Sequence, residues 1–87
     1  MAVYGGDLAQ LEALSRQFLT EIEVVDGLQS RVSRVVETTA WSGPAAERFR
    51  TQWSQDFVPA LLRLKEALAE SSAIVTDRRR AIEMATG

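Results

Sequence analysis

A seven-residue repeat of mostly apolar side chains keeps one frame from residue 8 to residue 36. The repeat consists of three neighbouring columns: Leu8, Ser15, Ile22, Gln29 and Val36; Leu11, Phe18, Val25 and Val32; and Leu14, Glu21, Leu28 and Val35. Most positions in each column are apolar. A strict seven-residue period is typical of a helix that supercoils against other helices. We therefore expect one long helix here, beginning at Asp7, whose carboxylate can accept hydrogen bonds from the first free amides.

A second amphipathic segment follows Gly43-Pro44, because proline at the first helical position loses no intrahelical hydrogen bond. Its main column is expected to be Ala46, Trp53, Ala60, Ala67, Ile74 and Ala81, flanked by Phe57 and Leu64 on one side and by Leu61, Leu68, Val75 and Ile82 on the other. Pro59 lies inside this segment, and the pattern predicts that it faces outward and bends the helix modestly.

The sequence therefore predicts an all-α fold with one domain over residues 1–87. Helix 1 is expected at about residues 7–39, the turn at about 40–43 and helix 2 at about 44–84, forming an antiparallel helix–turn–helix hairpin. Each helix has about three apolar columns, which is more than one hairpin seam buries. We expect two hairpins to pair into a four-helix bundle dimer, with an identical or a related chain. The candidate dimer-interface residues are Leu11, Phe18, Ile22, Val25, Trp53, Phe57, Leu61, Leu64 and Leu68.

The composition argues against several kinds of function. The chain has no cysteine and no histidine, so it lacks the thiol nucleophile, the commonest general base and the commonest zinc ligands. Its formal charge of −2 shows no basic excess for nucleic-acid binding. The acidic clusters on the two helices, Glu21 with Glu23 and Asp26, and Glu66 with Glu70, are more simply solvated faces than metal ligands or proton-sharing pairs. We expect no enzyme, no cofactor and no metal.

Trp41-Ser42-Gly43 lies where the chain is expected to reverse. A tryptophan at such a corner can cover the open end of the core, and glycine accepts backbone conformations that other residues resist. The stretch from Trp41 to Trp53 adds small residues after the glycine and an aromatic at Phe49. With the length of the chain and its two amphipathic helices, this stretch resembles the WXG (ESAT-like) family of small type VII secretion substrates.

The resemblance implies a dimer, with itself or a paralogous WXG-like protein, that an ATPase-driven type VII system exports folded and without a signal peptide. By position, Trp41 and Gly43 take the turn and secretion role. The family also uses a Tyr-x-x-x-Asp/Glu element after helix 2, often supplied by the partner. Here the corresponding residues are Arg79 and Glu83, and the chain's single tyrosine is at position 4. Either a partner supplies this element, or the chain is the chaperone-like member of a pair.

Two other functions are consistent with the same pattern. A cytoplasmic helical-bundle adaptor that is not exported would explain the missing tyrosine. Membrane contact is the third candidate, because Val58, Leu62 and Ala69 add a thin apolar line to helix 2. The mixed charges of the polar faces favour a protein partner over a lipid surface. The N-terminal residues lack the pattern of a secretory signal peptide, and no apolar run is long enough to cross a bilayer.

Overall fold

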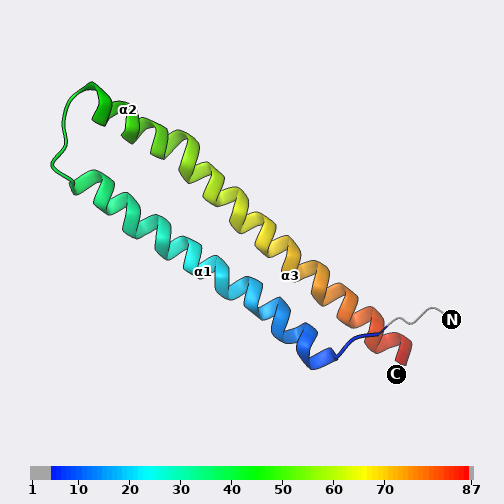
Figure 1. Cartoon of the computed structure of the whole chain (residues 1–87). Coiled ribbons are helices and arrows are strands. Elements are labelled where there is room, and N and C mark those ends of the chain that lie inside the picture. Colours follow the sequence, from blue (N-terminus) through cyan, green and yellow to red (C-terminus); the bar gives the residue numbers. More distant parts are fainter. Residues whose placement is uncertain (1–4, 87) are drawn as a thin grey trace.

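Two antiparallel helical rods form the molecule (Figure 1). The computed structural model describes residues 5–86. The first rod is α1, Leu8–Thr38. The second is continuous and comprises α2, Pro44–Gln52, a π-helical turn η1, Trp53–Phe57, and α3, Val58–Thr86. The hairpin measures 65 × 19 × 15 Å. The predicted all-α fold and hairpin are confirmed, and the helix boundaries lie within about two residues of those expected from the sequence.

Local capping explains where the helices begin and end. The Asp7 carboxylate accepts a hydrogen bond of 3.0 Å from the Gln10 amide, as expected for an N-cap. Helix α1 ends at Thr38, and the Thr39 amide closes the last turn on the Val35 carbonyl at 2.9 Å. Gly43 then adopts φ 109° immediately before Pro44, a backbone conformation that L side chains rarely adopt. The chain therefore reverses over residues 39–43.

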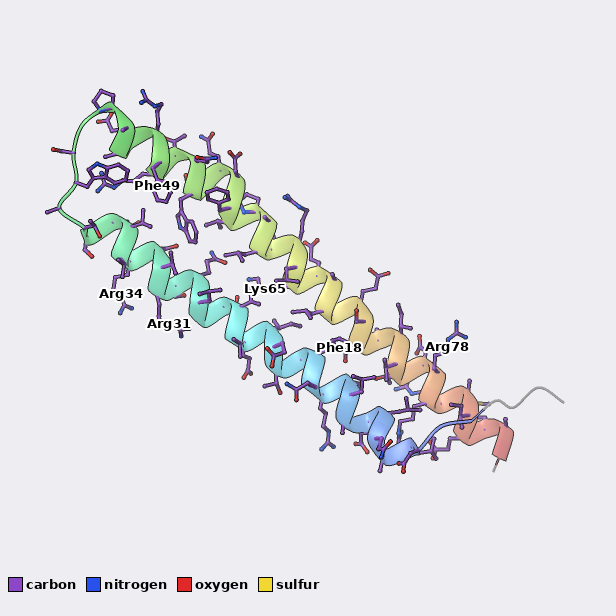
Figure 2. The ribbon with its side chains drawn as sticks, in the orientation of Figure 1. Phe18, Arg31, Arg34, Phe49, Lys65 and Arg78 are labelled. Carbon is purple, nitrogen blue, oxygen red and sulfur yellow. The ribbon has the colours of Figure 1, made fainter. Side chains whose placement is uncertain are left out.

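The seam between the rods uses the first two columns of α1, as the repeat indicates. Val25 and Ser15 are buried there, and the other members of these two columns are half-buried. The facing side of α3 consists of Val58, Leu61, Lys65, Leu68, Ser72, Val75, Arg79 and Ile82. In Figure 2, Phe18 and Lys65 lie between the two rods. The seam of α3 is thus less apolar than the seam of α1.

The predicted main column of the second helix is wrong beyond Trp53. Trp53 and Leu61 both face α1, yet they are eight residues apart instead of seven. The π-turn absorbs the extra residue, with the Val58 amide bonding to the Trp53 carbonyl. One added residue rotates the following helix by about 100°. The column of Ala60, Ala67, Ile74 and Ala81 is therefore exposed, and a flanking column takes its place in the seam.

Pro59 accounts for the place of this π-turn. Proline has no amide hydrogen, and in a regular helix its ring clashes with the carbonyl four residues earlier. The wider turn directly before Pro59 is where the backbone departs from regular α-helix. The expectation that Pro59 faces outward is wrong, because the same rotation leaves it half-buried.

Polar contacts hold the two rods in one register. The buried Ser72 hydroxyl donates to the Ser15 carbonyl at 2.9 Å, and the Arg79 Nε donates to the Leu8 carbonyl at 3.3 Å. Lys65 forms an ion pair with Asp26 in the middle of the seam. A sliding of either helix would break all of these contacts together. They also define which residues lie level with one another, with Ser15 beside Ser72 and Leu8 beside Arg79.

Candidate functional site

The most prominent surface feature is an apolar strip along one side of the hairpin. Leu28 of α1, Phe57 of η1 and Ala60 of α3 line one groove together with the seam residues Val32, Trp53 and Leu61. The outer columns of the two rods therefore lie on the same side. Helical spacing places further exposed side chains in these columns. We call this surface the open face, and it consists of Leu14, Val24, Leu28, Val35, Phe49, Phe57, Ala60, Leu64, Ala67 and Ile74.

Most large apolar residues that the structure leaves exposed belong to the open face. Phe57 and Leu64 are 40% and 46% exposed, and Ile74 is 50% exposed. By contrast, Val25 and Ala46 are the only buried hydrophobic residues in the part of the chain that the structure describes. The hairpin thus leaves more large apolar side chains accessible than it buries. Exposed apolar surfaces of this kind are typical of interaction sites.

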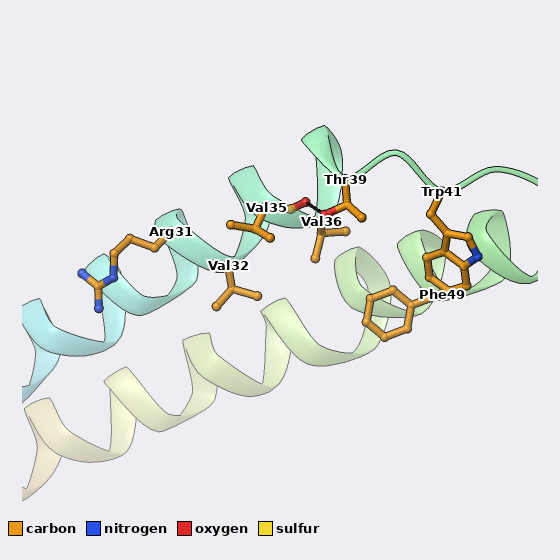
Figure 3. A pocket seen from close by; sticks show the side chains of 7 residues that line it. All are labelled: Arg31, Val32, Val35, Val36, Thr39, Trp41 and Phe49. Atoms are coloured by element: carbon orange, nitrogen blue, oxygen red, sulfur yellow. Dashed lines mark hydrogen bonds between the residues drawn. The ribbon is translucent and has the colours of Figure 1, made fainter.

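At the turn end, the open face deepens into a hollow of about 400 Å³ lined by Arg31, Val32, Val35, Val36, Thr39, Trp41 and Phe49 (Figure 3). Trp41 and Phe49 form one wall, with ring centroids 5.9 Å apart. The valines of α1 form the other wall, and Arg31 lies at the end farthest from Trp41. Val32 lines both this hollow and the groove beside Phe57, so the two depressions are neighbours on the same side of α1.

Arg50 and Trp53 hold the turn end in place. The Arg50 guanidinium donates to the Val36 and Thr39 carbonyls, at 3.1 and 3.0 Å. These carbonyls belong to the end of α1 and have no intrahelical partner. The Trp53 indole donates to the Ser33 hydroxyl at 2.9 Å and packs edge-on against Phe57. The walls of the hollow are therefore positioned by hydrogen bonds that the heptad pattern did not indicate.

The two predicted turn residues occupy the expected place. Trp41 is 46% exposed, so it covers the turn end only in part and presents much of its indole to solvent. A Cβ at Gly43 would meet nothing within 4 Å, so its positive φ, and not crowding, is what favours glycine there. Their role in secretion stays a prediction.

The structure divides the candidate dimer-interface residues into two groups. Leu11, Phe18, Ile22, Val25, Trp53, Leu61 and Leu68 lie in the seam, where they hold the chain's own hairpin together. Phe57 and Leu64 lie on the open face. Val24 and Phe49 also lie on the open face but are not among the predicted dimer-interface residues. The seven-residue spacing does not distinguish them from other outward-facing positions.

The remaining surface offers little for chemistry. Among residues 5–86, no three acidic side chains lie close enough together to hold a metal ion. No helix in this part of the chain is long and apolar enough to span a membrane. Comparison with family models, with curated proteins and with solved structures finds no match to this chain.

Proposed function

We propose that this chain is an ESAT-like type VII secretion substrate, or the dimerisation partner of one, and that it acts by packing its open face against a second helical hairpin. The observation that carries the proposal is the set of exposed apolar side chains of the open face, which runs from the Trp41 hollow to Ile74. A four-helix bundle is the arrangement that covers such a strip on two rods. The large residues at its centre, Phe57 and Leu64, are the expected energetic anchors.

The size of the exposed surface supports pairing. The accessible surface of the single chain is 6602 Å². A compact monomer of 9.6 kDa would expose roughly 5,100 Å² by the usual scaling of surface with mass. A standard interface covers about 800 Å² of each partner. The excess is thus large enough to accommodate a stable interface.

The turn supports the assignment to the secretion pathway. A half-exposed Trp41 beside an apolar hollow gives a transport ATPase or a partner an aromatic edge and a cavity to contact. Arg79 stands at the family's tyrosine position, and its Nε donates to the Leu8 carbonyl. Its guanidinium nitrogens lie 3.6 Å from Oε2 of Glu83 and 3.8 Å from Oε2 of Glu12. We propose that the partner chain contributes the tyrosine element.

Secretion of a Trp41→Ala variant tests this role. The chain is expressed with its genomic neighbour in a type VII-competent host, and culture filtrate and cells are compared. We expect the wild type in the filtrate and the variant mainly in cells, because Trp41 is the exposed part of the turn. Leu62→Ala is the matched control, since Leu62 is 50% exposed but lies outside the open face. Equal export of wild type and Trp41→Ala would remove Trp41 from the secretion role.

One observation favours a second candidate function, a cytoplasmic bundle adaptor. Arg79 and Glu83 pair with each other, and Arg79 also approaches Glu12 of α1, so this end of the hairpin is tied internally. An adaptor would use the same open face without being exported. Recovery of the wild type only in the cell fraction, even with its neighbour present, would select this function.

A further inference from the structure

Among the open-face residues of α1 lie two charged side chains of opposite sign, Glu21 and Arg31, that form no ion pair within residues 5–86. Glu21 accepts a hydrogen bond from Gln17 but forms no ion pair within residues 5–86, and Arg31 forms none there either. Glu21 lies one heptad before Leu28, and Arg31 lines the hollow beside Val35. Both therefore belong to the side of α1 that a partner would cover.

We infer that the partner on this face is a second copy of the same chain, docked antiparallel so that Glu21 of each copy meets Arg31 of the other. This inference rests on the proposed pairing through the open face. In an antiparallel helix pair around a two-fold axis, a residue before the axis meets one equally far beyond it. Glu21 and Arg31 are centred on position 26, and so are Val24 and Leu28. One axis thus pairs two charges with their opposites and two apolar residues with each other.

The second rod leads to the same axis independently. On the open face of α3 and η1, large and small residues alternate: Phe57, Ala60, Leu64 and Ala67. An antiparallel crossing centred on position 62 places Phe57 over Ala67 and Leu64 over Ala60, which are the large-on-small contacts of close helix packing. Ser15 lies beside Ser72, so position 26 of α1 lies within about one residue of the level of position 62. The two crossings therefore share one axis.

Other arrangements of two copies are less favourable. With both turns at the same end, α1 of one copy lies over the second rod of the other, residue level with residue. Glu21 then meets the region of Ala67 and Arg31 meets Phe57, so each charge is covered by apolar groups without a partner. In the antiparallel arrangement the two-fold axis passes near the middle of α1, Leu8–Thr38. Most of the open face of each copy therefore contacts the open face of the other.

Charge reversal tests the inference by sedimentation equilibrium of the full chain, with helical circular dichroism as the check on folding. Each dimer has two contacts between position 21 of one copy and position 31 of the other. Glu21→Arg makes both contacts Arg–Arg, and Arg31→Glu makes both contacts Glu–Glu. We expect each variant to dimerise at least about tenfold more weakly than the wild type. The two variants mixed in equal amounts bring opposite charges together at both positions. We expect the mixture to form a heterodimer within about threefold of the wild-type affinity.

The controls are Glu23→Arg and Arg34→Glu, which change the same charges on exposed residues outside the open face. They should leave the dissociation constant unchanged. A wild-type chain that stays monomeric, or single variants that do not recover on mixing, would overturn the inference. These results are separate from the secretion assay: a monomer whose export depends on Trp41 overturns only the self-pairing, and a charge-dependent dimer that is never exported overturns only the secretion role.

Discussion

Arg50 shows how a single side chain joins the two ends of the turn. It extends from α2 to the Val36 and Thr39 carbonyls and supplies hydrogen bonds that the end of α1 cannot make for itself. Hydrogen bonds from a charged donor are stronger than neutral ones. Because Arg50 is only half-buried, water partly competes for the same carbonyls. Arg50 is thus the residue that sets the geometry around Trp41 and Phe49.

Replacing Arg50 with Met should therefore destabilise the hairpin by about 1–2 kcal/mol, since two hydrogen bonds are lost while most of the side-chain volume is kept. Urea denaturation followed by circular dichroism measures this change. Arg48→Met is the control, because Arg48 is exposed on the same helix. An equal loss in both variants would mean that Arg50 has no special part in the turn.

At the level of elements, the π-turn decides which side of the second rod faces α1. The hydrogen bond to Ser33 places Trp53, at the start of η1, toward α1, and Leu61 of α3 faces α1 as well. Trp53 and Leu61 face the same way although they are eight residues apart, so a regular α-helix would leave one of them misdirected by about 80°. The extra residue of η1 removes this conflict, and it also exposes the column that contains Ala60 and Ile74.

Deletion of one residue should accordingly be tolerated in the π-turn but destabilise the hairpin when it is made in α3. Removing Gln55 from the π-turn leaves Trp53 and Leu61 seven residues apart, so both still face α1 in a regular helix, and we expect the fold to persist. Removing Glu66 from α3 turns Leu68, Val75 and Ile82 out of the seam, which should cost about 3 kcal/mol or more for three partly buried side chains. Thermal unfolding of the two deletion variants compares them directly. A Gln55 deletion as damaging as the Glu66 deletion would contradict this account of the turn.

At the level of the whole molecule, a thin rod of 65 × 19 × 15 Å has too little interior to cover its apolar residues. Burial of the open face against a second copy adds the contacts that a single hairpin lacks. Because association stabilises only the folded state, the melting temperature should rise with protein concentration. A compact monomer whose melting temperature is high and independent of concentration would contradict pairing.

Phe57→Ser should remove most of this concentration dependence, because Phe57 lies at the centre of the open face and is 40% exposed in the single chain. We expect at least about a tenfold increase in the dimer dissociation constant, measured by sedimentation equilibrium. Leu62→Ser is the matched control on the other side of α3 and should leave dimerisation unchanged. Similar weakening in both variants would mean that the partner does not select the open face.

The sequence by itself determined the two helices, their ends and the position of the turn. These features depend on neighbouring residues: the Asp7 cap, the heptad spacing of α1, and Gly43 before Pro44. Only the tertiary structure decided which column of the second rod lies in the seam and which lies on the open face. That choice depends on one extra residue in a π-turn, and contacts on both sides of Pro59 are needed to show it. Leu64 belongs to the open face because the rotation of the whole of α3, and not its own spacing, placed it there.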